Sequence, residues 1–165
     1  MNALLKVVSL HAGLARLLNH LSSLTLLVTR FYVGWQFTKS GWIKYTSWDT
    51  TTYLFENEYH VPLLPPDVAA VAGTFGELFF PVLLYLGLFG RLGALGTFFV
   101  NAMAVMSYRQ VLLAEGSEAA LGSHILWGFM LWVLIVFGCG RLSIDTLLER
   151  RLALRCRPNA PALTQ

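Results

Sequence analysis

The chain has 165 residues, of which 56% are hydrophobic and only 13% are charged, and its mean hydropathy is +0.59. An average soluble domain carries about 25% charged residues, so this composition excludes an ordinary cytosolic enzyme. The surplus of 12 Lys and Arg over 9 Asp and Glu is small, which argues against a nucleic-acid-binding chain and suits a membrane surface better. The two cysteines, Cys139 and Cys156, have neither disulfide-framework nor zinc spacing. We expect one compact membrane unit.

Residues 1–22 are predicted to form an amphipathic helix that lies in the plane of the lipid headgroups. At about 100° per residue the polar side chains fall in one narrow arc and the leucines lie outside it, as in interfacial helices. A plain extension of the first membrane span is the alternative, and no clean signal-peptide cleavage site is present. The polar arc consists of Asn2, Lys6, Ser9, Gly13, Arg16 and His20.

Four later stretches are long and apolar enough to cross a hydrocarbon core of about 30 Å. They lie near residues 24–44, 68–88, 93–113 and 121–140. The short connection around Gly90 and Arg91 makes the second and third stretches an antiparallel hairpin. The predicted fold class is all-α: an integral-membrane four-helix bundle over residues 23–150 that follows the interfacial helix. A soluble bundle is the alternative, but such a helix would show a charged face, which the stretch 68–88 lacks.

The positions of Lys and Arg predict the orientation, because positively charged flanks stay on the cytoplasmic side of a membrane. The N-terminal flank, the hairpin and residues 141–157 carry most of the arginines, whereas acidic residues gather on the opposite side. We therefore expect a multi-pass protein of a bacterial inner membrane with both termini in the cytoplasm. Residues 151–165 are predicted to be a basic, disordered cytoplasmic tail.

The long connection at residues 45–67 is rich in aromatic residues and threonine. Asp49 is predicted to cap a short helix over residues 50–58. Pro62, Pro65 and Pro66 are expected to lead the chain in an extended form into the next span. The aromatic side chains would then cover the mouth of the bundle on the outer side.

Glu77 is the most informative residue, because a charged side chain near the middle of a span is costly unless it is protonated, paired or hydrated. We expect it to face the bundle interior, as a proton acceptor, an anchor for a polar headgroup or a purely structural group. We predict that Arg30 pairs with it. Helix packing alone would also explain the stripe on which Arg30 lies, which consists of Arg30, Gly34, Phe37, Gly41 and Lys44.

Arg109 and His124 lie near the outer ends of the third and fourth spans, where they could form a polar pocket beneath the aromatic loop. A hydrogen-bonded interface residue is the plainer interpretation of His124. Asn101 and Ser107 are expected to form hydrogen bonds between helices. No nucleophilic triad, nucleotide-binding loop, haem motif or zinc tetrad is present, and we predict no metal site. Any cofactor must be lipid-soluble or held by a partner.

The stripe, Glu77 and the sequence that follows the fourth span together resemble the DoxX family of small bacterial inner-membrane proteins. The most specific part is Gly138-Cys139-Gly140-Arg141-Leu142-Ser143-Ile144-Asp145, which hydrophobicity alone does not demand. The resemblance covers residues 24–150, and Cys139 departs from it where a proline or a similar residue is expected. The other residues that carry it are Arg30, Gly34, Phe37, Ser40, Gly41, Lys44, Glu77 and Arg91.

This resemblance implies a membrane subunit of a redox system, quinone-linked or related to thiol and oxidative-stress defence, that works with a partner enzyme. A quinone would be bound by Arg30, Phe37, Lys44, Glu77, Arg109 and His124, with Glu77 taking up a proton. The first alternative is a non-catalytic membrane platform that docks an enzyme, including one that makes modified copper-binding peptides. Residues 58–66 are similar to the branch of the family that comprises the membrane partners encoded with such enzymes. Transport by a homo-oligomer is the second alternative, and nucleic acid is not expected as a partner.

Overall fold

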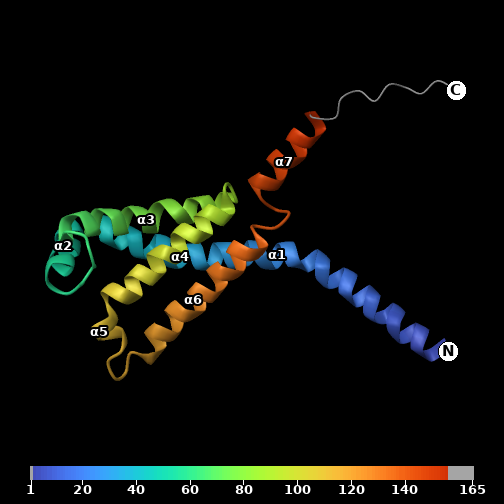
Figure 1. Cartoon of the computed structure of the whole chain (residues 1–165), viewed down its shortest axis with the longest axis horizontal. Coiled ribbons are helices and arrows are strands. Elements are labelled where there is room, and N and C mark those ends of the chain that lie inside the picture. Colours follow the sequence, from blue (N-terminus) through green and yellow to red (C-terminus); the bar gives the residue numbers. More distant parts are fainter. Residues whose placement is uncertain (1, 156–165) are drawn as a thin grey trace.

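The computed structural model describes residues 2–155, and within them the chain forms seven α-helices. They are α1 (Asn2–Thr46), α2 (Trp48–Asn57), α3 (Pro66–Leu86), α4 (Gly90–Ser107), α5 (Arg109–Leu112), α6 (Glu118–Phe137) and α7 (Ile144–Arg155). Figure 1 shows α3, α4, α6 and the second half of α1 gathered in a bundle, with the first half of α1 and α7 projecting from one end. The predicted all-α class is confirmed.

The bundle is built from three main helix contacts. Helix α1 packs on α3, α3 on α4 and α4 on α6, while α6 touches α1 less extensively. Close approach of α1 and α3 depends on two glycines: a Cβ at Gly34 would lie 2.7 Å from the ring of Tyr85, and one at Gly41 would lie 2.9 Å from Cβ of Glu77. The buried core between the helices consists of Val33, Phe37, Leu84, Ala94, Leu131 and Leu134.

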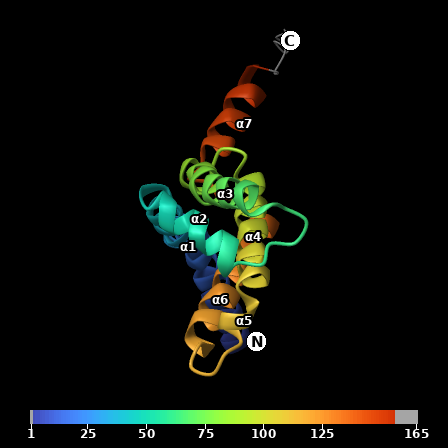
Figure 2. The same cartoon turned by 90° about the vertical axis from the view of Figure 1, so that its left-hand side faces the viewer.

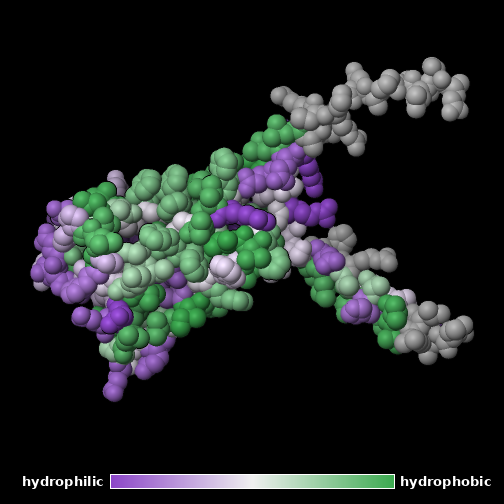
Figure 3. Space-filling view, viewed as in Figure 1, coloured by the Kyte–Doolittle hydropathy of each residue, from purple (hydrophilic) through white to green (hydrophobic). Residues whose placement is uncertain are grey.

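Helices α3 and α6 are long and apolar enough to cross a membrane. Of the large apolar side chains of helix α6, only Leu131 and Leu134 are buried, and Ile125 and Phe129 are each 65% exposed. A core helix of a soluble protein would bury such side chains, so their exposure favours contact with lipid. Figure 3 shows apolar residues over the flank of the bundle and hydrophilic residues gathered at the end that carries α2 and α5. Two of the four predicted spans therefore have membrane-crossing length and composition.

The helix boundaries differ from the predicted ones in three places. Helix α1 runs unbroken for 45 residues, so no break separates the predicted interfacial helix from the first span. The third predicted span, 93–113, is interrupted: α4 starts at Gly90 and ends at Ser107, and Tyr108, with φ −110° and ψ 22°, separates it from α5. Helix α7 extends into the predicted tail as far as Arg155, and residues 156–165 lie outside the described part of the chain.

The connection between α1 and α3 contains the expected short helix, α2, although its cap is not Asp49. Ser47 occupies the N-cap position without a side-chain hydrogen bond, and Asp49 lies in the first turn, where its charge favours the helix dipole. Pro65 is extended, with φ −58° and ψ 146°, and Pro66 begins α3. Figure 2 views the bundle from this end, with α2 lying across it in front of α3. The ring of Phe55 is buried there against Ala69 and Ala70.

Residues 138–145, which we call the exit segment, fasten the end of α6 to the hairpin between α3 and α4. The carboxylate of Asp145 accepts hydrogen bonds from the backbone N–H groups of Phe89 at 2.8 Å and Gly90 at 2.9 Å. Its own N–H donates to the carbonyl of Gly87 at 3.0 Å. The first amides of a helix lack intrahelical partners and carry a partial positive charge, so a carboxylate is the natural group to bind them.

Candidate functional site

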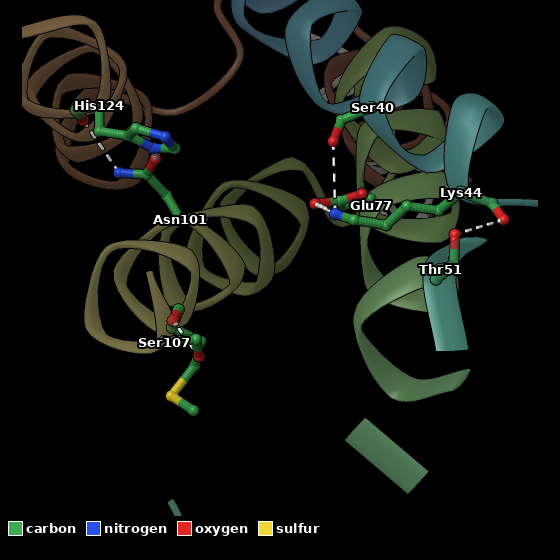
Figure 4. A network of polar contacts seen from close by, with 8 residues as sticks. Ser40, Lys44, Thr51, Glu77, Asn101, Ser107 and His124 are labelled. Carbon is green, nitrogen blue, oxygen red and sulfur yellow. Dashed lines mark hydrogen bonds and ion pairs between the residues drawn. The ribbon is translucent and has the colours of Figure 1, made fainter. Parts of the chain in front are cut away.

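Glu77 is buried in α3 and forms an ion pair with Lys44 of α1. Nζ of Lys44 donates to Oε1 of Glu77 at 2.5 Å and to Oγ of Ser40 at 3.3 Å. The side chain of Glu77 is 6% exposed and that of Lys44 is 20% exposed. Figure 4 shows the three side chains converging from α1 and α3. Glu77 thus faces the interior as expected, but the prediction that Arg30 is its partner is wrong.

The pairing of α1 with α3 explains why Lys44, and not Arg30, reaches Glu77. Gly34 lies against Tyr85 and Gly41 lies against Glu77, so the two helices run in opposite directions and Lys44 stands one turn past the point of contact. Arg30 precedes Lys44 by fourteen positions, about 21 Å along the axis of a helix. Both residues are on the same stripe, but they lie at opposite ends of the bundle.

Two buried oxygen atoms beside the ion pair have no hydrogen-bond partner among the described residues. They are Oε2 of Glu77 and Oγ1 of Thr74, one turn earlier on α3. Most buried polar groups in proteins are hydrogen-bonded, so a cluster that lacks partners needs an explanation. In addition, Pro81 has no N–H with which to bond the backbone carbonyl of Glu77, four residues earlier. This face of α3 therefore carries a carboxylate oxygen that can accept a hydrogen bond and a hydroxyl group that can donate or accept one.

A pocket of about 180 Å³ opens next to Lys44, between α1 and α2. Thr51 of α2 donates a hydrogen bond to the carbonyl of Lys44 at 3.0 Å, which attaches α2 to α1. Pockets for drug-sized ligands measure roughly 300–1,000 Å³, so this one admits only a small polar group or ring. Its lining consists of Ser40, Ile43, Lys44, Ser47, Thr50, Thr51, Leu54 and Tyr59.

Tyr59 is half-buried at the wall of this pocket. Its ring packs edge-on against Phe55 at 4.9 Å and against Tyr108 at 5.1 Å between ring centroids. Burial raises the pKa of the Tyr59 hydroxyl above its ordinary value, and the charges of Tyr108 and Glu77 add to this effect. The hydroxyl therefore stays protonated at neutral pH and is available as a donor at the pocket wall.

In the described part of the chain, none of the remaining candidate residues is hydrogen-bonded or ion-paired to Lys44 or Glu77. Phe37 is a core residue whose ring packs edge-on against Trp127 at 5.9 Å. His124 of α6 is hydrogen-bonded to Asn101 of α4, with 2.8 Å between Nδ1 and Oδ1. Arg109 is exposed at the start of α5, and among the described residues no hydrogen bond or ion pair joins it to another side chain.

Arg30 is fully buried at the other end of the bundle, where it contacts the exit segment. Its Nη2 donates to the carbonyl of Leu142 at 2.7 Å, while Nε and Nη1 have no hydrogen-bond partner within residues 2–155. Gly87, with a positive φ of 61°, lies so close that a side chain at this position would overlap Nη1 of Arg30. The contacts of Arg30 thus tie α1 to the segment after α6 and to the α3–α4 hairpin.

Sequence reasoning missed several polar groups of the site. Ser40 precedes Lys44 by four residues and Thr74 precedes Glu77 by three, so helical spacing from the two charged residues could have found both. Tyr59 carries no such signal, because it lies in a loop. Asn101 does bond another helix, as predicted, whereas the hydroxyl of Ser107 donates to the carbonyl of Met103 in its own helix.

Membrane-length helices, outward apolar side chains and a buried Lys–Glu pair define a helical membrane-type protein with a polar site between its helices. More specifically, the chain belongs to the DoxX family, whose model matches residues 25–110. A protein of Haemophilus influenzae described as uncharacterized is 29% identical over 133 residues, which cover 78% of this chain and 86% of that protein. No solved structure matches the chain at a significant level. The family match includes Arg30, Lys44 and Glu77, and the exit segment lies beyond it.

Proposed function

We propose that this protein is the membrane subunit of a redox system and that the Lys44–Glu77 site binds the polar group of a lipid-soluble carrier of the quinone class. The observation that carries the proposal is the pair of unpartnered buried oxygens, Oε2 of Glu77 and Oγ1 of Thr74, beside a buried ion pair. Such a site is costly to keep within an apolar helix bundle unless a ligand, a proton or water satisfies it. A partner enzyme supplies the electrons.

A bound quinone would supply the two-electron chemistry of the redox system. Glu77 binds the polar edge of the ring and holds or releases a proton at Oε2. Lys44 stabilises the carboxylate through Oε1, and Ser40 orients the ammonium group. The pocket between α1 and α2 is lined by Lys44 and Ser40 and would give protons a route between the ion pair and the surface.

The same proposal includes a four-span topology in a bacterial inner membrane with both termini in the cytoplasm. Helices α1 and α4 pack directly on α3 and α6, the two helices with membrane-crossing composition, and complete the bundle. The first half of α1 and helix α7 leave the bundle at the same end, as an even number of crossings requires (Figure 1). The arginine-rich flanks lie at this end, which favours the cytoplasmic side.

The test is purification in mild detergent, followed by mass spectrometry and absorbance for bound quinone, in the wild type and in Glu77→Gln. Glu149→Gln is the matched control, because Glu149 is exposed on α7 far from the site. We expect quinone in a fixed ratio to wild-type and Glu149→Gln protein, and its loss in a folded Glu77→Gln protein. A wild-type protein without quinone that still retains an enzyme partner would refute the pocket and favour the membrane-platform function.

A further inference from the structure

The pair formed by His124 and Asn101 lies apart from the Lys44–Glu77 pair, as Figure 4 shows. Asn101 is 5% exposed. Its Nδ2 donates to the backbone carbonyl of His124 at 3.0 Å, and its Oδ1 lies 2.8 Å from Nδ1 of the imidazole. Gly128 makes room for this amide, because a Cβ there would lie 3.3 Å from Nδ2 of Asn101. The side chain of Asn101 thus spans the backbone and the ring of one residue.

The backbone carbonyl determines which way the amide of Asn101 faces. A carbonyl oxygen only accepts hydrogen bonds, so Nδ2, the donor, must face it and Oδ1 must face the ring. Rotating the amide would place Oδ1 against the carbonyl, which leaves two buried acceptors in contact. Because Oδ1 also only accepts, the hydrogen of the neutral imidazole must be on Nδ1. The other ring nitrogen, Nε2, is then an acceptor without a hydrogen.

We infer that Asn101 is a positioning residue that holds His124 in the Nδ1–H tautomer, so that Nε2 accepts a hydrogen bond from a hydroxyl group of the ligand. The described residues provide no hydrogen bond to Nε2. The ring of His124 packs against Trp127 at 5.0 Å between ring centroids, and Trp127 packs against Phe37 of α1 at 5.9 Å, so His124 lies on the side of α6 that faces α1. Oε2 of Glu77 is likewise an unfilled acceptor. While Glu77 is ionised, Nε2 of His124 and Oε2 of Glu77 are both acceptors, which favours the reduced, hydroxyl-bearing hydroquinone over the quinone, whose carbonyls cannot donate.

The identity of the ligand rests on the proposed function, but the tautomer does not, so the two are tested separately. The first measurement is the ¹⁵N chemical shifts of histidine in ¹⁵N-His-labelled protein in detergent, at a pH where imidazole is neutral. The chain has 4 histidines, and His124→Gln assigns the signal of interest. We expect a protonated Nδ1 and an unprotonated Nε2 in the wild type. Asn101→Leu should shift the population toward Nε2–H.

Thr97→Val is the matched control for this measurement. Thr97 is buried one turn before Asn101 on α4, and its hydroxyl bonds the carbonyl of Gly93 in its own helix. Its replacement removes a buried hydroxyl from the same helix without touching His124, so the tautomer should not change. A wild-type His124 with hydrogen on Nε2 would overturn the inference.

The second measurement compares the dissociation constants of a short-chain benzoquinone and of its hydroquinone under anaerobic conditions. We expect the wild type to bind the hydroquinone more tightly than the quinone. In Asn101→Leu the ratio of the two dissociation constants should fall about fivefold, which is the effect of one hydrogen bond. An unchanged preference in Asn101→Leu would overturn the ligand role of His124. Failure of the wild type to bind either form, with the expected tautomer present, would refute the proposed function and with it the ligand role, while the positioning by Asn101 would stand.

Discussion

At the scale of single residues, the two members of the Lys44–Glu77 pair are not equivalent. Glu77 is almost completely buried, whereas Lys44 reaches the pocket and is partly exposed. Removing the ammonium group leaves a buried carboxylate without a counter-charge, which is costly. Changing the carboxylate to an amide leaves an acceptor for Lys44 and removes the charge that needed compensation. The stability of the protein should therefore respond differently to the two changes.

Lys44→Met is expected to lower the free energy of unfolding by about 2 kcal/mol, since exposure of Lys44 reduces the cost of breaking a buried pair. Glu77→Gln should cost less, and Lys44→Met/Glu77→Gln should recover part of the loss of the Lys44→Met variant. The measurement is thermal unfolding in detergent, followed by circular dichroism. A Lys44→Met protein as stable as the wild type would show that the pair does not form.

A second residue-scale prediction concerns Gly90, whose Cα lies against Cys139. A Cβ at Gly90 would overlap Sγ of Cys139, so Gly90→Ala overpacks the junction of α4 and the exit segment. We expect a loss of about 1–3 kcal/mol in the free energy of unfolding. Replacing Cys139 with alanine as well should restore part of the lost free energy of unfolding, because Sγ of Cys139 is the atom that the new methyl group would overlap.

Gly122→Ala is the control for the Gly90 experiment. Nothing lies within 4 Å of the position that a Cβ would take at Gly122, inside helix α6. This substitution should be neutral or slightly stabilising, because alanine reduces the entropy of the unfolded chain. If Gly90→Ala behaved like Gly122→Ala, the exit segment would not pack on α4 as described.

At the scale of elements, the exit segment joins helices that are distant in the sequence. Asp145 binds amides that lie 55 and 56 positions earlier, and Arg30 binds a carbonyl 112 positions later. These contacts bring the middle of α1, the ends of α3 and α6 and the start of α4 to one place. The sequence of the exit segment is thus explained by tertiary hydrogen bonds, since hydrophobicity alone requires none of its residues.

Asp145→Asn should destabilise the start of α4 by about 1 kcal/mol, because an amide has one acceptor oxygen and no charge to offer the helix terminus. The local measurement is hydrogen–deuterium exchange of peptides that cover residues 87–92, where we expect faster exchange. Glu149→Gln, on the exposed part of α7, should leave these peptides unchanged. Equal exchange in the Asp145→Asn and wild-type proteins would contradict the cap.

At the scale of the whole molecule, the proposed topology places the loop before α3 outside the cell and α7 inside it. Leu63 is 100% exposed in that loop. In a background without Cys139 and Cys156, we expect Leu63→Cys to react with a membrane-impermeant maleimide on intact cells. Glu149→Cys should react only after the membrane is permeabilised. Labelling of both positions on intact cells, or protection of Leu63→Cys, would overturn the topology.

The sequence by itself determined the helical class, the membrane-crossing length and apolar composition of α3 and α6, and the glycine stripe of α1. Hydrophobicity, length and helical spacing are properties of one segment at a time, so they can be read without knowing what the segment touches. The same reasoning predicted the short helix before α3 and the inward position of Glu77. It also identified Lys44 as a member of the stripe that faces a neighbouring helix.

Only the tertiary structure decided which residue of that stripe meets Glu77. The choice between Arg30 and Lys44 depends on how far α1 slides along α3, and this register is set by the fit of Gly34 against Tyr85 and of Gly41 against Glu77. The end of α4 at Ser107 and the cap of Asp145 on α4 likewise depend on contacts across the chain. Spacing along one helix contains no information about such contacts. They join side chains from different helices, and the relative depths of these side chains in the bundle are set only when the helices pack.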